Sequence, residues 1–178
     1  LRARGKLKVP DPDRAAELYE LTMQVTSGAG LPAYEISNHA APGQECAHNL
    51  VYWRYGDYAG VGPGAHGRLT IDGAKWATAT QTRPEDWWQA AMVDGHGMSD
   101  FTSLLPMEAA DEMLLMGLRL REGVEMARFT ALAGNPLDEK RIAFLEGEGF
   151  VERTDQGRLR ATPAGFLVLD AIVADLAA

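Results

Sequence analysis

The order of the predicted elements in residues 104–178 constrains the fold more than any other feature of the sequence. Apolar residues at helical spacing and one tight-turn sequence predict, in order, three helices, a β-hairpin and a last helix. These elements fall at residues 107–118, 125–133, 138–146, 150–161 and 163–176. The first helix has an apolar face of Met107, Ala110, Leu114 and Leu118. Three helices followed by a hairpin is the order of the winged-helix fold, a variant of the helix-turn-helix.

Charge argues against DNA binding by this region. Its 75 residues contain 8 basic and 13 acidic side chains, in a chain of formal net charge −8. The helix that would read the DNA groove has two cations against three carboxylates, namely Lys140, Arg141, Asp138, Glu139 and Glu146. Nucleic-acid binding depends on an excess of cations. We therefore expect no nucleic-acid partner and interpret the region as a packing or partner-docking domain.

Residues 11–79 contain a predicted helix followed by strands, an order typical of the last units of an α/β layer. Asp11 as N-cap and Pro12 at the first helical position predict a helix that stops near Gly28. Its apolar face contains Leu18, Leu21 and Val25. The strands predicted after it lie at residues 33–36, 58–61, 68–71 and 75–79, the last two as a hairpin around Asp72-Gly73.

These elements divide the chain into three regions. Residues 1–82 contain the helix and strands, residues 83–103 are a connector with a short helix over 84–93, and residues 104–178 form a separate small domain. The predicted fold class is therefore α+β or α/β, with an α/β layer followed by a winged-helix-like domain.

The single cysteine limits the metal chemistry of the chain. Cys46 excludes an internal disulfide and any iron–sulfur cluster held by three or four cysteines of this chain. Together with His39, His48 and His66 it has the ligand types of a zinc site, but the irregular spacing and the lack of a second cysteine pair argue against one.

No targeting segment is evident. Residues 1–9 contain four basic residues, but no apolar segment follows them, so they do not form a signal peptide. No apolar run approaches the ~20 residues of a membrane helix. We expect a cytoplasmic chain without a membrane span.

Two local clusters are candidates for ligand binding. The first, residues 48–53, is predicted to lie in a loop, where His48 could ligate a metal or haem iron while Tyr52 and Trp53 stack on a flat ring. A loop fixed by a buried His–Asn hydrogen bond explains the same residues. The second, Gly60–Gly67, has four glycines in eight residues and could expose N–H groups to a ligand. A tight bend between two strands explains it equally well.

Glu35 is a further candidate, as a general acid or base next to the end of a predicted strand. A solvated strand carboxylate is the alternative, and no second carboxylate lies close by in the sequence.

Three ordered motifs give the chain a close resemblance to one family. They are Leu31-Pro-Ala-Tyr-Glu-Ile-Ser-Asn-His-Ala40, His48-Asn-Leu-Val-Tyr-Trp53 and Gly56-Asp-Tyr-Ala-Gly-Val-Gly-Pro-Gly-Ala-His-Gly67. The sequence resembles the oxygen-independent coproporphyrinogen III oxidase-like radical SAM proteins, specifically the HemW-type haem chaperones. The resemblance extends over nearly the whole chain.

The resemblance implies a missing part. In the family, an N-terminal partial (β/α) barrel carries a CxxxCxxC motif, whose 4Fe-4S cluster cleaves S-adenosylmethionine. This sequence lacks that motif. We therefore expect the C-terminal half only: a remnant of the barrel up to about residue 80, and from about residue 105 the family's C-terminal domain. The chain alone is then expected to be inactive.

The resemblance also implies site residues. The HNxxY motif, associated with haem binding, corresponds to His48, Asn49 and Tyr52, with His48 as the ligand of the haem iron. The family's glycine turn at the S-adenosylmethionine pocket corresponds to Gly62, Gly64, Ala65 and His66, which would supply backbone contacts or shape.

The expected partners are haem or porphyrin, the N-terminal barrel half and a protein that receives haem. A barrel cut before Asp11 would expose a sheet edge, so we also expect self-association. The competing hypothesis is a non-catalytic module in which the acidic winged helix docks a protein partner. That hypothesis predicts no affinity for haem or S-adenosylmethionine.

Overall fold

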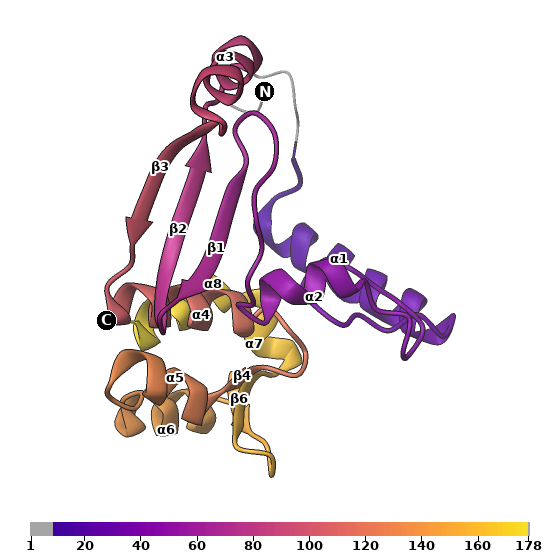
Figure 1. Cartoon of the computed structure of the whole chain (residues 1–178). Helices are drawn as coiled ribbons and strands as arrows, with labels where there is room; N and C mark the ends of the chain where they lie inside the picture. Colours follow the sequence, from indigo (N-terminus) through magenta and orange to yellow (C-terminus); the bar gives the residue numbers. More distant parts are fainter. Residues whose placement is uncertain (1–8, 178) are drawn as a thin grey trace. The chain divides into compact units, whose positions relative to one another are not determined.

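The computed structural model describes residues 9–177 of the chain (Figure 1). It contains two compact units, one that ends at Cys46 and one that begins at Ala47. Within the described residues, no helix is long and apolar enough to cross a membrane.

The first unit consists of helix α1, Pro12–Gly28, and the segment after it. The Asp11 carboxylate accepts a hydrogen bond of 2.9 Å from the Arg14 amide, which confirms the predicted N-cap. The apolar face predicted for α1 is exposed rather than buried, and it consists of Leu18, Leu21 and Val25.

The strand predicted at residues 33–36 is wrong. Ala33 forms only an isolated bridge with His39, so the segment folds back on itself as a loop. Glu35 lies fully buried in this loop, and its carboxylate accepts hydrogen bonds from the amide (3.0 Å) and the hydroxyl of Ser37. A solvated carboxylate is therefore also the wrong interpretation, and Glu35 serves to close the loop.

The second unit begins with helix α2, Ala47–Trp53, and continues with a three-stranded antiparallel sheet. Its strands, in the order β1-β2-β3, are His66–Ile71, Ala74–Thr80 and Met98–Ser103. The predicted hairpin is confirmed, since Asp72 and Gly73, with φ of 51° and 80°, form the turn between β1 and β2. Such left-handed backbone is what makes Asp-Gly a favoured turn sequence.

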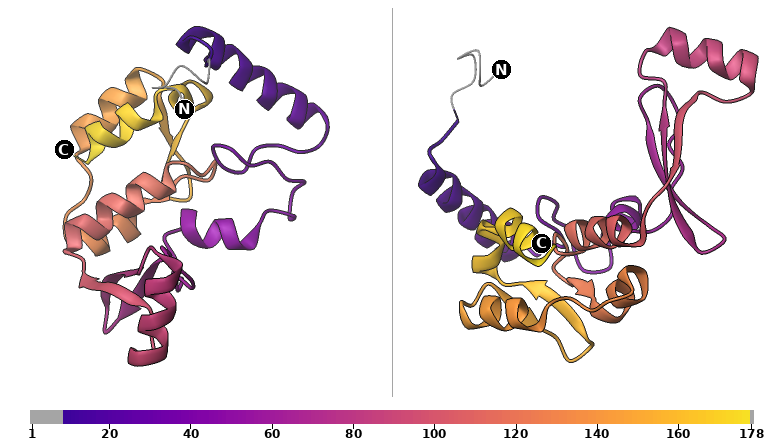
Figure 2. Two further views of the ribbon diagram at one scale, coloured as in Figure 1. Left: turned by 90° about the horizontal axis from the view of Figure 1, so that it is seen from above. Right: turned by 90° about the vertical axis from the view of Figure 1, so that its left-hand side faces the viewer.

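Two predictions around this sheet need correction. The strand predicted at 58–61 is reduced to a single bridge between Tyr58 and Arg68. Strand β3 lies in the predicted connector and is exposed along its whole length, so it has no buried apolar alternation that would reveal it in the sequence. The helix predicted before it is confirmed as α3, Pro84–Asp94, which joins β2 to β3 at one end of the sheet (Figures 1 and 2).

The rest of the second unit contains five helices and a second small sheet. The helices are α4 Pro106–Gly117, α5 Met126–Ala133, α6 Glu139–Gly147, α7 Pro163–Leu167 and α8 Leu169–Leu176. The strands are β4 Val124–Glu125, β5 Val151–Arg153 and β6 Arg158–Ala161, paired antiparallel in the order β4-β6-β5. The predicted hairpin is thus confirmed, whereas β4 is too short to predict, and the predicted last helix is interrupted at Val168.

The core of the second unit lies among these helices and the second sheet. Its largest fully buried apolar side chains are Leu114, Leu118, Leu120, Ile142, Leu159, Ile172 and Val124. Each such side chain contributes about 1.5–3 kcal/mol on burial. The predicted face of α4 is confirmed except for Met107, which is exposed. The structure is therefore a mixed α/β fold with two small, open sheets within the described residues.

Candidate functional site

The residues of the HNxxY motif lie on a helix, so the predicted loop at residues 48–53 is wrong. Residues four apart on a helix share a face, and α2 accordingly brings His48 and Tyr52 together. Their ring centroids are 4.7 Å apart with planes at 87°, an edge-to-face contact. His48 is exposed and Asn49 half-buried. An exposed imidazole does not agree with the alternative of a buried His–Asn pair.

A small tyrosine-lined hollow lies beside Tyr52. The rings of Tyr52 and Tyr58 are 4.3 Å apart. Together with side chains from β1 and α4 they line a pocket of about 160 Å³, whose other residues are Tyr55, Arg68, Glu112, Leu115 and Met116. The hollow thus combines aromatic and aliphatic surface with one half-buried ion pair, Arg68–Glu112.

Tyr55 anchors the chain directly after α2. Its φ is 52°, a left-handed conformation that is uncommon for a bulky residue. The side chain is 4% exposed, its hydroxyl donates a hydrogen bond of 2.7 Å to Glu112, and the ammonium of Lys75 lies 4.6 Å from its ring centroid. Lys75 is itself held by Asp57 at 2.7 Å. Such contacts offset the strain of the backbone.

Glu112 of α4 ties this anchor to the sheet. Its two oxygens accept hydrogen bonds of 2.8 and 2.6 Å from Arg68 of β1, in a bidentate pair. Burial alone would raise the pKa of the Glu112 carboxyl, but the hydrogen bonds from Arg68 and Tyr55 outweigh burial and hold the pKa below its usual value. Burial, and then the hydrogen bond to Glu112, raises the pKa of the Tyr55 hydroxyl. At neutral pH Glu112 is therefore an ionised acceptor and Tyr55 a neutral donor.

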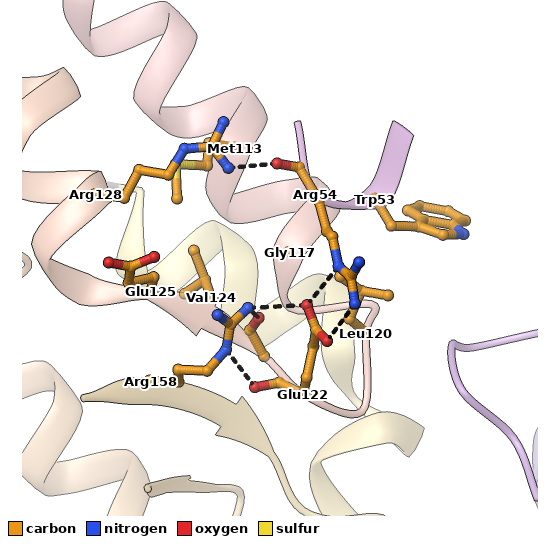
Figure 3. Close-up of a pocket in the computed structure, with 11 residues that line it drawn as sticks. Trp53, Arg54, Met113, Gly117, Leu120, Glu122, Val124, Glu125, Arg128 and Arg158 are labelled. Atoms are coloured by element: carbon orange, nitrogen blue, oxygen red, sulfur yellow. Dashed lines mark hydrogen bonds and ion pairs between the residues drawn. The ribbon is translucent and has the colours of Figure 1, made fainter. Parts of the chain in front are cut away.

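A second set of contacts also fixes the end of α2. Arg128 of α5 donates to the carbonyl oxygen of Arg54, and Arg54 forms a bidentate pair with Glu122 at 2.9 Å (Figure 3). Arg128 also donates to the carbonyl oxygen of Tyr55 at 2.8 Å. Glu122 also accepts from Arg158 at 3.1 Å. The hydrogen bond from Arg54 lowers the pKa of Glu122. Helix α2 is thus held at its C-terminal end by side chains from α4, α5 and the segment before β4.

The glycine turn is stabilised from within the chain. Gly62 and Gly64 have φ of 103° and 68°, which explains why glycine is needed at both positions. The amide of Gly64 donates to the Gln81 carbonyl at 2.8 Å, and that of Ala65 to the Thr80 hydroxyl at 2.8 Å. These two N–H groups are therefore already hydrogen-bonded within the chain. A ligand at the turn would have to contact other atoms of the turn.

The residues around α2 fit a haem better than they fit an iron–sulfur cluster or a zinc ion. The exposed His48 imidazole beside the aromatic hollow has the donor and the apolar surface that a haem edge requires, although 160 Å³ is below the ~300 Å³ of an ordinary ligand pocket. One cysteine, Cys46, does not fit a cysteine-held iron–sulfur cluster. Among residues 9–177, no group of three or more His, Cys, Asp and Glu side chains could hold a metal ion, which leaves the zinc alternative without support.

Sequence reasoning missed the residues that hold α2 in place. Tyr55, Glu112 and Arg128 belong to no motif and meet over separations of 57 and 73 residues. Only a conserved spacing or a structure could reveal such long-range partners. His48 and Tyr52 were predicted and are together, while the glycine turn is a separate feature before β1.

Comparison with known proteins defines the class of this fold. Residues 104–168 match the family model of the HemN C-terminal domain. The chain superimposes on coproporphyrinogen III oxidase (HemN) from Escherichia coli with a TM-score of 0.65 and 16% identity, over 94% of this chain and 42% of that one. The similarity of structure shows a shared fold.

Sequence relatives identify the family. The chain is 34% identical to radical S-adenosyl methionine domain-containing protein 1, mitochondrial, of Bos taurus, over 97% of this chain and 41% of that protein. It is 32% identical to the heme chaperone HemW of Mycobacterium tuberculosis, over 97% and 42% respectively. The chain is homologous to the C-terminal part of HemN- and HemW-like radical SAM proteins, and it spans about two fifths of the length of these relatives.

Proposed function

We propose that this chain is the haem- or porphyrin-handling C-terminal part of a HemW-like radical SAM protein. The observation that carries the proposal is the pairing of an exposed His48 with Tyr52 on α2, beside an aromatic hollow. The names of the relatives, which include heme chaperones, support the ligand class. Residues 104–178 would form the winged-helix-like domain, and the preceding sheet the remnant of a partial barrel.

Each residue of the motif would have its own role. The His48 imidazole would bind the iron of haem, which is the cargo of the protein. Tyr52 fixes the imidazole by its edge-to-face contact and offers an aromatic edge to the tetrapyrrole. Asn49, on the same helix, would orient the ligand by its amide. Because the anchor at Tyr55 holds the end of α2, the imidazole is presented without a loop having to order first.

The radical chemistry would lie in the rest of a longer protein. There a 4Fe-4S cluster would supply the electron that cleaves S-adenosylmethionine, and the turn at Gly62, Gly64, Ala65 and His66 would shape one wall of that pocket. Chaperone activity is proposed ahead of porphyrinogen oxidation. The chain by itself is proposed to be inactive, and a cytoplasmic setting remains our prediction.

A haem titration tests the proposal. We expect haem to give a Soret band with the wild-type chain that shifts and weakens in the His48→Ala variant, because the axial ligand is lost. The His96→Ala variant is the matched control, since His96 is also exposed but lies between α3 and β3. A Soret spectrum unchanged by His48→Ala would overturn the assignment.

The second candidate function is a non-catalytic protein-interaction module. The acidic charge of residues 104–178 and the exposed Phe144 on α6 favour it, because an apolar side chain among carboxylates suits a basic protein partner. This alternative predicts no haem binding at all, so the same titration separates the two. The N-terminal half of a longer protein, a haem recipient and a second copy of the chain remain proposed partners.

A further inference from the structure

A second pocket lies at the end of α2 and shares no lining residue with the tyrosine-lined hollow. It has a volume of about 300 Å³, at the lower end of the range for small-molecule sites. We call it the arginine pocket, after Arg54, Arg128 and Arg158, which line it together with Glu122, Glu125 and Trp53 (Figure 3). Its floor is apolar, formed in part by the buried side chains of Leu120 and Val124.

The charges of the arginine pocket do not cancel. Three guanidinium groups face two carboxylates, which gives a formal charge of +1. Arg54 and Arg158 share one carboxylate, that of Glu122, at 2.9 and 3.1 Å. Within residues 9–177, Arg128 forms no ion pair. Arg54 and Arg128 are exposed to solvent, so this excess of positive charge is accessible to an anion that enters the pocket.

The unpaired charge is also held in a fixed position. Backbone carbonyls hold Arg128 by both of its terminal nitrogens, at Arg54 and Tyr55. Arg158 uses Nε and Nη2 on Glu122 and Gly123. A guanidinium has five N–H donors, so Nε of Arg128 and Nη1 of Arg158 keep donors without a hydrogen-bond partner among the residues the structure describes. Carbonyls orient these cations but do not neutralise them.

We infer that the arginine pocket binds a carboxylate carried on an apolar body. A monoanion balances the formal charge of +1, whereas a phosphate dianion would exceed it. Two oxygens suit donors from two guanidiniums, and Trp53 with the apolar floor suits a hydrocarbon or ring attached to the carboxylate. The carboxylate could come from a free organic acid or from a propionate side chain of a tetrapyrrole. The site stands on its own geometry and does not depend on iron ligation by His48.

The test uses 3-phenylpropionate as probe and its neutral amide as control. We expect saturable binding of the acid in titrations followed by NMR, with the amide at least about tenfold weaker because it lacks the charge. Arg128→Gln should weaken the acid by about tenfold, and Glu125→Gln should strengthen it by removing the opposing carboxylate. Arg160→Gln is the matched control, because Arg160 pairs with Glu152 outside the pocket.

The outcomes separate the possibilities. Equal binding of acid and amide, or an unchanged affinity in both Arg128→Gln and Glu125→Gln, would overturn the site. Arg128→Lys keeps the charge if Arg128→Gln does not fold, and should retain most of the binding. Displacement of the probe by haem but not by haem dimethyl ester would identify a tetrapyrrole propionate as the source, and no displacement by either would identify a free acid. A Soret band that does not change in His48→Ala would overturn the proposed haem ligand but not the arginine pocket, because the probe titrations do not involve His48.

Discussion

The hydrogen bond from Tyr55 to Glu112 joins the end of α2 to α4. Removing it should show how much this anchor contributes to the stability of the fold. The bond is 2.7 Å long, and its donor is almost completely buried. A hydrogen bond to a charged group contributes about 1.5–3 kcal/mol. Because water cannot easily replace the Tyr55 hydroxyl in this position, we expect Tyr55→Phe to lower the free energy of unfolding by about 2 kcal/mol. That corresponds to a Tm lower by roughly 4–8 °C.

The assay is urea denaturation followed by far-UV circular dichroism, with the double variant completing a mutant cycle. Glu112→Gln also weakens the pair with Arg68, and is expected to cost about 2–4 kcal/mol. Introduced into the Glu112→Gln variant, Tyr55→Phe should lower the free energy of unfolding by at least about 1 kcal/mol less than it does in the wild type, because the charged acceptor is already gone. Tyr58→Phe is the matched control: Tyr58 lies in the same hollow, but among the described residues its hydroxyl forms no hydrogen bond.

Two results would refute this reasoning. One is a Tyr55→Phe effect as small as that of Tyr58→Phe, which we expect to stay below about 0.5 kcal/mol. The other is strict additivity of the two changes, which would mean that Tyr55 and Glu112 are neighbours without energetic coupling.

Three further predictions concern the same unit. Leu114→Ala removes a fully buried side chain and should cost about 2–5 kcal/mol in urea denaturation. Gly123→Ala should cost roughly 2 kcal/mol or more, because φ is 73° and the new methyl group would overlap the Leu159 carbonyl, whereas Gly134→Ala, with similar φ and open space, should cost about 1 kcal/mol. Glu112 has a folded pKa below its unfolded value, so its contribution is complete above the unfolded pKa of about 4.3 and is lost as the pH falls through the folded pKa. Thermal melts should therefore show a loss of Tm between about pH 5 and pH 3 that is smaller in Glu112→Gln.

Local signals in the sequence predicted local structure. Asp11 before Pro12 predicted the start of α1, and Asp72-Gly73 predicted the hairpin, because a cap and a tight turn involve only a few neighbouring residues. The same logic explains the main failure within the site. Helix α2 has only seven residues, too few to show a helical period of apolar residues, so it could not be predicted from residues 47–53.

Long-range contacts were beyond these signals. The strand expected at residues 33–36 depends on neighbours that the sequence does not specify, and the segment forms a loop around Glu35 instead. The anchor at Tyr55 depends on Glu112 and Arg128, which lie 57 and 73 residues further along the chain. The resemblance to the family named His48 and Tyr52, but only the structure joins them to the side chains that hold their helix.

The left-handed backbone of Tyr55 has a consequence for motion. A residue in this conformation cannot relax by a small rotation without disturbing its carbonyl, its ring and its hydroxyl, which contact Arg128, Lys75 and Glu112 respectively. Helix α2 and the helices that carry Glu112 and Arg128 should therefore open to solvent as one cooperative block, and their amides should exchange hydrogen at a common rate. A change in the stability of α2 would then be shared by α4 and α5 together.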